Sequence, residues 1–488
     1  MRIAAPRDLA LAASIALGAG IVYAFTFQTR YYGDGPGLAT LHVLAREQGY
    51  YNVLYLPVCD LVQGLLAPFG GSDPFLALRL VSILPAALGL GLSFVVLRAA
   101  GAERFGALVA TLALSVSPAL WFFGTTIEVH ALNYGTVAGV AALTLYAPWR
   151  RPAIAVALVA AAFPFLYWAH QTAFTLGLGW VFLVQFARGR SGRIFSRPAL
   201  LFGVGPLLLL ALVLAVLAAF LVRFGSLEPI WAEVRANVDL KSLHEAARCP
   251  VWSEEWVLPL GALVPLSVAG SARLRRVPGL APAVGLLLGV PTAFLLWWGV
   301  CESGGYFLGS DLFLLVPVAF LFGRFSVAKA AIALALLVGQ ALYARQRIEA
   351  WDAGLDPRER VAQVQSAIGE SGLVITVGRF APDIRCYLPG VEELLLTNFV
   401  RQVCAREPEP VPPERLLLLL GPYLDRLLER WEHVCVEFGS RRFPAESWAG
   451  YAALVPQAAA IEGYLRAHFE VRDLPHPDWP LVVLVKRR

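Results

Sequence analysis

Residues 75–97 have the sequence FLALRLVSILPAALGLGLSFVVL, an apolar run that carries a single charged residue, Arg79. A helix of this length crosses the roughly 30 Å hydrocarbon core of a bilayer. Similar runs recur along the 488 residues, of which 58% are hydrophobic and only 15% charged, with a mean hydropathy of +0.64. A soluble protein carries about 25% charged residues. The sequence therefore predicts a polytopic α-helical membrane protein.

Apolar runs separated by polar breaks predict about eleven membrane spans. The expected segments are 8–27, 75–97, 105–123, 132–147, 153–169, 172–187, 199–222, 257–271, 279–299, 306–323 and 327–344. No cleavable signal peptide stands apart from the first segment, so we expect the N-terminus to be retained.

Basic residues gather in every second loop between these segments. They are Arg2, Arg7, Arg98, Arg104, Arg150, Arg151, Arg188, Arg190, Arg193, Arg197, Arg273, Arg275, Arg276, Arg324 and Lys329. Because cytoplasmic loops carry such an excess, we expect a cytoplasmic N-terminus and, with eleven spans, an extracytoplasmic C-terminal region. The net charge of +5 is carried by these loop arginines. In a membrane protein such a pattern sets topology, and no nucleic-acid partner is expected.

The residues after 344 differ from the rest in composition. Charges become dense, 371–377 and 481–485 are typical of buried strands, and 414–432 is typical of a helix. We therefore expect two domains, a membrane domain over 1–344 and a small extracytoplasmic α/β domain over 345–488.

The six cysteines are all expected on the outer side of the membrane. They are Cys59, Cys249, Cys301, Cys386, Cys404 and Cys435. An oxidising compartment permits a Cys249–Cys301 disulfide or a pair within the C-terminal region. The alternative is six free, buried thiols. Their spacing does not suggest a zinc site.

The loop after the first segment, residues 28–74, is long for a connection. Its apolar pieces 37–46 and 52–66 are expected to form helices along the membrane interface. Asp34 stands between glycines in Gly33-Asp34-Gly35. A partly desolvated carboxylate at the membrane border suits a general base, and the alternative is a helix N-cap.

Other polar residues interrupt the apolar sequence at the turns expected on the same side. Glu128 and His130 lie between the third and fourth segments, and His170 lies between the fifth and sixth. Ionisable residues at membrane depth usually mark a function, although in an interfacial loop they cost little. Arg79, near the outer end of its span, either extends to the lipid headgroups or binds a phosphate.

These motifs resemble the GT-C superfamily of membrane glycosyltransferases, and most of all the bacterial homologues of transmembrane protein O-mannosyltransferases. The most specific match is Glu128-Val129-His130-Ala131-Leu132-Asn133. Weaker matches are Gly33-Asp34-Gly35, Arg79-Leu80-Val81-Ser82, His170 and Tyr306-Phe307-Leu308. The family's Asp-x-Gly-Glu turn and its Pro-Pro-Gly-Tyr-Pro run are replaced by Asp34-Gly35-Pro36-Gly37 and Gly49-Tyr50-Tyr51-Asn52-Val53. Both differences lie where the acceptor would bind.

The resemblance implies a GT-C-like fold and transfer of a sugar, a hexose such as mannose, from a polyprenyl-phosphate-linked donor. The acceptor would be a hydroxyl of a protein, lipid or glycan on the outer face, and the anomeric configuration would invert. Asp34 would be the general base, and Arg79 and His170 would stabilise the leaving phosphate. Glu128 would act beside Asp34 in catalysis.

The resemblance also implies substrate-binding roles for His130, Asn133 and Tyr306. It leaves a divalent metal open, Mg or Mn held by Asp34, Glu128 and His130, because some GT-C enzymes use one and others do not. It implies residence among the lipids of a bacterial inner membrane, which the Arg-rich, Lys-poor composition suits.

Two other kinds of function are open from the sequence. A transporter or flippase of lipid-linked intermediates would carry broken helices and ionisable residues near the bilayer midplane, where the expected spans have few charges. A non-catalytic assembly protein would use the C-terminal domain for binding. The Asp34 and Glu128 motifs favour the enzyme.

Overall fold

The computed structural model describes residues 5–28, 35–43, 53–71, 73–190, 194–225, 257–274, 277, 279–298, 305–351, 357–376, 382–395, 412–431, 434–437, 464, 467, 469–473 and 481–486. By its internal contacts the chain divides into two units. The first comprises Met1–Gln28 with Glu47–Asp352, and the second comprises Thr29–Arg46 with Ala353–Arg488. The expected boundary after residue 344 falls within helix α18 (Val327–Trp351), and part of the first loop groups with the C-terminal residues.

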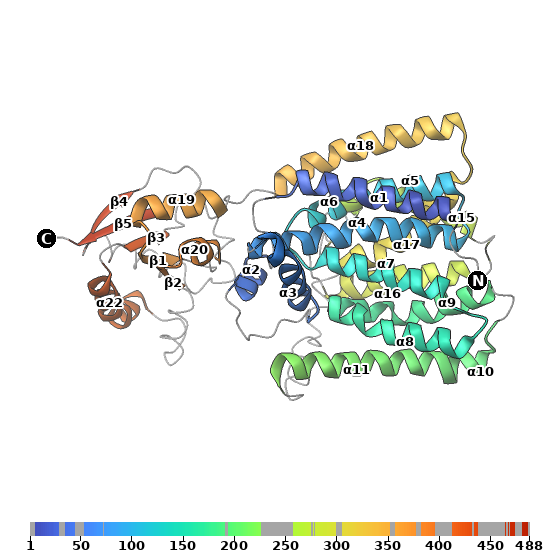
Figure 1. The fold of residues 1–488 in the computed structure, drawn as a ribbon, viewed down its shortest axis with the longest axis horizontal. Coiled ribbons are helices and arrows are strands. Elements are labelled where there is room, and N and C mark those ends of the chain that lie inside the picture. The colour runs from blue at the N-terminus through green and yellow to red at the C-terminus, as the bar shows by residue number, and fades with distance from the viewer. Residues whose placement is uncertain are drawn as a thin grey trace. The chain divides into compact units, whose positions relative to one another are not determined.

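Each expected apolar segment contains helix in the first unit (Figure 1). The elements are α1 (Pro6–Phe25), α4 (Pro74–Ala100), α5 (Arg104–Ser115), α6 (Pro118–Gly124), α7 (His130–Tyr146), α8 (Pro152–Ala169), η2 (Gln171–Leu176), α9 (Gly177–Gly189), α10 (Arg197–Ala199), η3 (Leu200–Val204), α11 (Gly205–Phe224), α14 (Leu258–Leu260), α15 (Leu263–Leu274), α16 (Leu280–Trp298), η5 (Gly305–Phe307), α17 (Leu308–Phe322) and α18. The expected interfacial helix over 52–66 is also present, as α3 (Tyr55–Leu66) followed by η1 (Ala67–Phe69).

Fewer helices satisfy the length and composition of a span than the sequence predicted. Among the described residues, six helices are long and apolar enough to cross a membrane, and a seventh span results if α5 and α6 count as one. These two helices, expected as a single span, meet at a bend of 63°. The bend follows from Ser117-Pro118, because the Ser117 hydroxyl caps α6 by accepting the Leu120 N–H and proline cannot continue the preceding helix.

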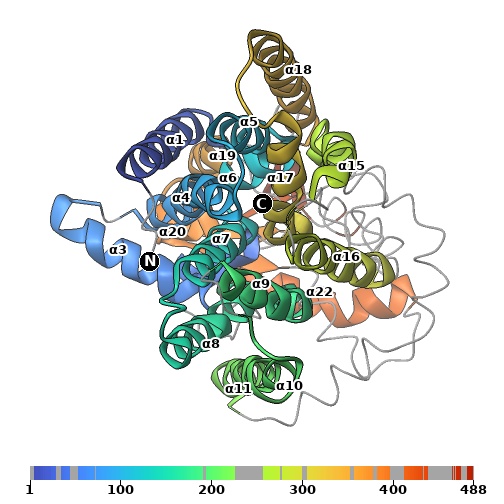
Figure 2. The same ribbon diagram turned by 90° about the vertical axis from the view of Figure 1, so that its right-hand side faces the viewer.

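Helix α17 lies in the middle of the helical unit, with α5, α7, α15 and α16 packed around it (Figure 2). Glycines permit two of these contacts. A Cβ atom on Gly106 of α5 would lie 2.0 Å from the Ala319 carbonyl oxygen, and one on Gly270 of α15 would lie 2.1 Å from that of Pro317. Close approach of helix backbones at small residues is typical of packing within membranes.

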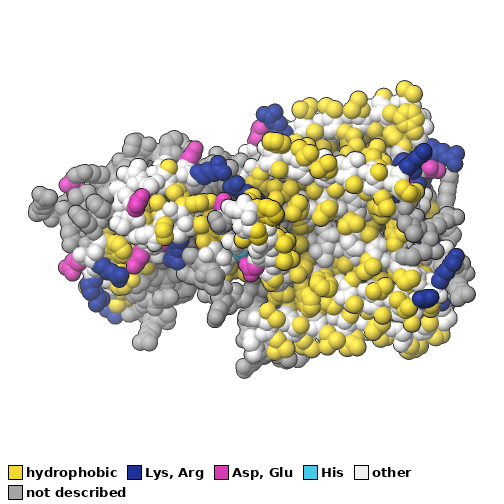
Figure 3. Space-filling view, viewed as in Figure 1, with side chains coloured by type: hydrophobic (Ala, Val, Ile, Leu, Met, Phe, Trp, Pro, Cys, Tyr) yellow, Lys and Arg dark blue, Asp and Glu magenta, His cyan; other side chains and the backbone are white. Residues whose placement is uncertain are grey.

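The face of the helical unit seen in Figure 3 is largely apolar. Large hydrophobic side chains on its peripheral helices are well exposed, including Leu17 on α1, Leu209 on α11 and Leu342 on α18. A contiguous apolar surface of this kind is unfavourable in water and normal against lipid. The helices and this surface together make the chain a membrane protein.

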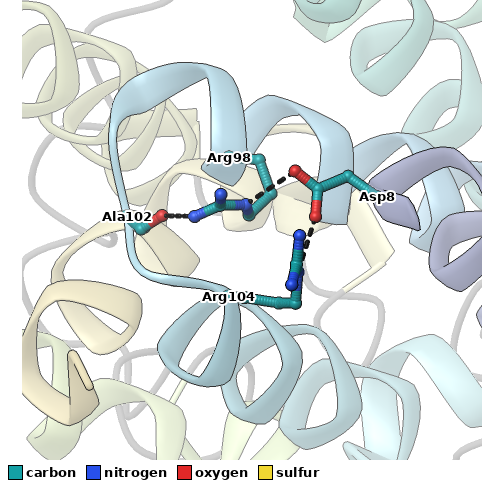
Figure 4. Close-up of polar contacts among 4 residues, drawn as sticks. All are labelled: Asp8, Arg98, Ala102 and Arg104. Carbon is teal, nitrogen blue, oxygen red and sulfur yellow. Dashed lines mark hydrogen bonds and ion pairs between the residues drawn. The ribbon is translucent and has the colours of Figure 1, made fainter. Parts of the chain in front are cut away.

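Ion pairs join helix termini at one end of the unit, which we call the basic end. The Asp8 carboxylate of α1 accepts hydrogen bonds from Arg98 Nε at 3.1 Å and from Arg104 Nε at 2.7 Å (Figure 4). Arg98 also donates to the Ala102 carbonyl oxygen. At the same end Arg324 pairs with Glu103 at 3.1 Å. The segments around Asp8, Arg98–Arg104 and Arg324 thus meet at this end of the unit.

The second unit contains a five-stranded sheet in the order β2-β1-β3-β5-β4. Its strands are β1 (Gly372–Thr376), β2 (Val391–Leu395), β3 (Val434–Glu437), β4 (Phe469–Asp473) and β5 (Leu481–Lys486), of which β1, β2 and β3 are parallel and β5 is antiparallel to β3 and β4. Its helices are α2 (Gly35–Val43), α19 (Pro357–Ile368), α20 (Pro382–Tyr387) and α22 (Pro413–Arg430). The two expected strands and the expected helix over 414–432 are confirmed.

Valine and isoleucine side chains from α19, β1 and α20 form the core of this sheet, together with Cys435. Helix α2, from the first loop, packs against α20. Among the described residues Cys59, Cys386 and Cys435 form no disulfide. The possible Cys249–Cys301 pair lies outside the described residues.

Candidate functional site

Three of the predicted site residues form one cluster at the end of the helical unit opposite the basic end. The ring centroid of His130 lies 5.2 Å from that of His170 and 5.0 Å from that of Tyr306, and His170 lies 5.1 Å from Tyr306. Phe123 packs against one side of this cluster, with its ring centroid 4.7 Å from that of His130. Both histidines are buried, with 1% and 2% of their surface exposed. Segments far apart in the sequence therefore meet here.

Glu128 stands in the turn that leads into α7, fully buried. Its Oε2 accepts the Val129 N–H at 3.2 Å. A carboxyl group at a helix N-terminus faces backbone N–H groups and the positive end of the helix dipole. The fold thus holds a buried carboxyl group two residues before His130.

The turn that carries Glu128 is fixed to the chain that follows α1. Gln28 donates through its backbone N–H to the Thr125 carbonyl oxygen at 2.7 Å and through Nε2 to the Thr125 hydroxyl at 2.9 Å. Trp121 Nε1 donates to the Thr26 hydroxyl at 2.9 Å. Gln28 precedes Asp34 by six residues in the sequence, but Asp34 itself lies outside the described residues.

His170 is held in one protonation form by its neighbours. Its Nδ1 accepts the backbone N–H of Thr172 at 3.3 Å and lies 2.7 Å from the Thr172 hydroxyl oxygen. In the neutral ring the proton is therefore on Nε2, which is left as a donor. Burial lowers the pKa of His170 well below its usual value of 6.5, and the neighbouring His130 lowers it further. The site thus contains a neutral imidazole at physiological pH.

Two other predicted residues lie on neighbouring helices. Asn133, one turn after His130 on α7, is 2% exposed, and its Oδ1 has no hydrogen-bond partner among the described residues. Arg79 on α4 is partly buried, its Nε lacks a partner there too, and its guanidinium carbon lies 5.4 Å from the Phe27 ring centroid. Each therefore retains capacity to bind a ligand.

The structure adds two buried groups that the sequence did not predict. Tyr55 on α3 is fully buried, and burial raises the pKa of its hydroxyl well above the usual value, with further contributions from Cys59 and Glu128. Asp311 is fully buried in the first turn of α17 and interacts electrostatically with Tyr134. Asp311 is a carboxylate inside the expected span over 306–323, which is itself a sequence signal of function, whereas Tyr55 was hidden among the aromatic residues typical of a membrane interface.

The expected metal ligands are only partly visible. Glu128 and His130 are close in sequence, and the third, Asp34, is not described. Within the described ranges no three His, Cys, Asp or Glu residues come together as a metal site would require. A divalent metal therefore stays a prediction.

No family model and no curated protein matches the sequence, but solved structures share its fold. ArnT from Cupriavidus metallidurans in the apo state superposes with a TM-score of 0.56 at 13% identity, over 97% of both chains. The same protein bound to undecaprenyl phosphate gives a TM-score of 0.53 at 14% identity, over 99% of this chain and 98% of that one. The chain has the GT-C membrane fold.

The archaeal oligosaccharyltransferase AglB from Archaeoglobus fulgidus, in complex with an inhibitory peptide and a dolichol-phosphate, is similar as well. Its TM-score is 0.52 at 13% identity, over 99% of this chain and 74% of AglB. At these identities the GT-C likeness establishes the fold, and the chemistry must be argued from the residues of this chain.

Proposed function

We propose that this GT-C-fold protein is a membrane glycosyltransferase that moves a sugar from a polyprenyl-phosphate-linked donor to an acceptor hydroxyl. The observation that carries the proposal is the buried cluster of His130, His170 and Tyr306 at one end of an apolar helical unit. Such a position suits a substrate whose lipid part stays in the bilayer while its reacting part meets polar groups. Structures of the same fold contain undecaprenyl phosphate or dolichol-phosphate, which supports a lipid phosphate carrier.

In the proposed reaction Asp34 takes the proton of the acceptor hydroxyl. The acceptor oxygen forms a bond to the anomeric carbon as the bond from that carbon to the phosphate oxygen breaks, with inversion. The polyprenyl phosphate leaves with the electron pair. Because phosphate is a good leaving group, the site needs donors that stabilise negative charge more than a strong acid.

Two residues suit this stabilising role. Arg79 carries a guanidinium group, which can donate to two phosphate oxygens at once. His170 is neutral with its proton on Nε2, and so it can donate one hydrogen bond. Glu128, His130, Asn133 and Tyr306 would orient the sugar and the acceptor, and a Mg or Mn ion would be held by Asp34, Glu128 and His130.

The finer parts of the proposal come from the sequence motifs. They are a hexose such as mannose as the sugar, a likeness to the O-mannosyltransferase-like branch, and a protein, lipid or glycan as the acceptor. The basic end would face the cytoplasm of a bacterial cell, and the site and the second unit would face outward, in accord with the excess of arginine.

The test is transfer of a radiolabelled hexose from polyprenyl-phosphate-hexose in proteoliposomes. Replacing the general base in Asp34→Asn should lower the rate about 10²–10⁴-fold. Asp60→Asn is the matched control, since Asp60 is an exposed carboxylate on α3 of the same loop, and it should transfer like the wild type. Unchanged transfer by Asp34→Asn would remove Asp34 as the base. No transfer by the wild type to protein, lipid or glycan acceptors would contradict the proposed function.

A further inference from the structure

Two glycines a helical turn apart begin the segment that carries Tyr306. They are Gly305, the first residue of η5, and Gly309 at the start of α17, in Gly305-Tyr306-Phe307-Leu308-Gly309. Figure 2 shows α17 beside α7, against which it packs. Glycines at this spacing give a helix a flat face that another helix can approach closely.

The face fits the functional side chains of α7. A Cβ atom on Gly305 would lie 2.5 Å from His130 Cδ2 and 2.7 Å from both His130 Nε2 and Phe123 Cζ. A Cβ on Gly309 would lie 3.0 Å from Asn133 Nδ2 and 3.2 Å from Val137 Cγ2. Since real Cβ atoms essentially never come within 3.0 Å of a neighbour, any side chain at Gly305 must displace the His130 ring.

An independent observation points to a ligand at the same place. Asn133 is 2% exposed, and its Oδ1 accepts no hydrogen bond from any described residue, although Gly309 lies against its Nδ2. A buried amide oxygen is unfavourable without a donor. A hydroxyl group of a sugar or of an acceptor would supply that donor.

We propose that Gly305 and Gly309 are positioning residues that seat the His130 ring and the Asn133 amide. Tyr306, between them in the sequence, reaches both histidines because the backbone on either side can approach α7. Asn133 Oδ1 is then left to accept a hydrogen bond from a substrate hydroxyl. The proposal rests on the proposed transferase function and adds the element that sets the geometry of its substrate-binding residues.

The test compares glycine substitutions that clash in different places. Gly305→Ala should lower kcat/KM for sugar transfer about 10–100-fold, since displacement of a positioned group by about 1 Å can cost this much. Gly309→Ala should have a smaller effect, and it should act on KM for the donor or acceptor because it displaces Asn133.

Two control variants separate positioning from general packing. Gly91→Ala creates a comparable clash, 2.7 Å from the Ala12 carbonyl oxygen between α4 and α1. It should lower Tm but leave kcat/KM per folded molecule within about twofold of the wild type. Gly289→Ala on α16 meets nothing within 4 Å and should change neither. Equal losses of kcat/KM in Gly305→Ala and Gly91→Ala would overturn the proposal.

A double-mutant cycle with His130→Ala tests the mechanism directly. Because His130→Ala removes the two ring atoms nearest to the new methyl group and leaves the contact with Phe123 Cζ at 2.7 Å, adding Gly305→Ala to it should cost less, in transfer and in Tm, than adding it to the wild type. Independent, additive losses would contradict positioning through His130. The Tm cycle needs no activity, so a wild type that transfers no sugar would refute the proposed function while the contact is still tested.

Discussion

The two ends of the helical unit use their polar residues differently. At the basic end, Asp8 accepts from Arg98 and Arg104, and Arg324 pairs with Glu103. At the other end the polar side chains include His130, His170 and Asn133, each at most 2% exposed, and the histidine rings pack against Tyr306 and Phe123.

The charged side chains at the basic end hold helices together. The polar side chains at the other end are available to a ligand. The carboxylate of Asp8 is paired with two guanidinium groups (Figure 4), so its role is structural. At the other end, Asn133 Oδ1 has no protein donor among the described residues, and His170 Nε2–H is a donor within the ring cluster. Burial of such groups away from water is unfavourable unless a substrate uses them.

The largest effect expected at the ring cluster is on catalysis, from His170→Ala. It removes a donor proposed to stabilise the leaving phosphate, so kcat should fall about 10²–10³-fold. The melting temperature should stay close to that of the wild type. Radiolabelled sugar transfer normalised to folded protein measures this. A variant that melts many degrees lower but keeps its kcat would make the ring cluster a packing feature, like the basic end.

Asp8→Ala should show the opposite pattern. Loss of the buried carboxylate leaves Arg98 and Arg104 without their shared partner, which should lower stability by about 1–3 kcal/mol, with transfer per folded molecule unchanged. Thermal unfolding in detergent gives the first quantity. Glu349→Ala, which removes an exposed pair with Arg345, is the control and should have little effect. Reduced kcat/KM without reduced stability in Asp8→Ala would contradict a purely structural role for the basic end.

The stability of the fold should depend on pH through the protonation of His170. Its pKa is lowered in the folded protein, so below the ordinary value of 6.5 the unfolded chain binds a proton that the folded chain does not. Stability should therefore be full above about pH 6.5 and fall by about 1.4 kcal/mol per pH unit as the pH drops below it, until the lowered pKa is reached. Unfolding of the wild type and His170→Gln at pH 5 and 7.5 checks this. A loss of equal size in both proteins would assign it to other groups.

Arg324→Ala should have the smallest effect. Its side chain is 87% exposed and its partner Glu103 is 50% exposed, so the pair should contribute about 1 kcal/mol or less. Urea unfolding at low and high salt measures it, and a larger value would mean that the basic end is held by its exposed pairs as well as by Asp8.

The positions of the helices followed from the sequence because length and hydropathy are local properties. Helix α4 coincides with the expected span over 75–97 to within a few residues. The interruptions of the helices were harder to predict from the sequence. The bend at Ser117-Pro118 and the 3-10 turn η2 before α9 depend on a cap and on packing, and each lies within a segment that was expected as one continuous span.

The site could be predicted in part for the same reason. Glu128, His130 and His170 interrupt apolar sequence at turns, which makes them visible without a structure. Asp311 lies inside an apolar run, and the strands β2 and β4 contain charged residues such as Glu392 and Arg472 that weaken a strand pattern. Which groups are buried together is a property of the tertiary fold, and the contact of Gly305 with His130 is one example.

The most direct test of the account places one carboxylate from each end in the same assay. Sugar transfer from polyprenyl-phosphate-hexose would be measured per folded molecule for the wild type, Glu128→Gln and Asp8→Asn. We predict that Glu128→Gln loses at least about 10²-fold in rate and that Asp8→Asn transfers at the wild-type rate. Equal rates for the two variants, or a wild type that transfers no sugar, would contradict the claim that the two ends of the unit divide structure from catalysis.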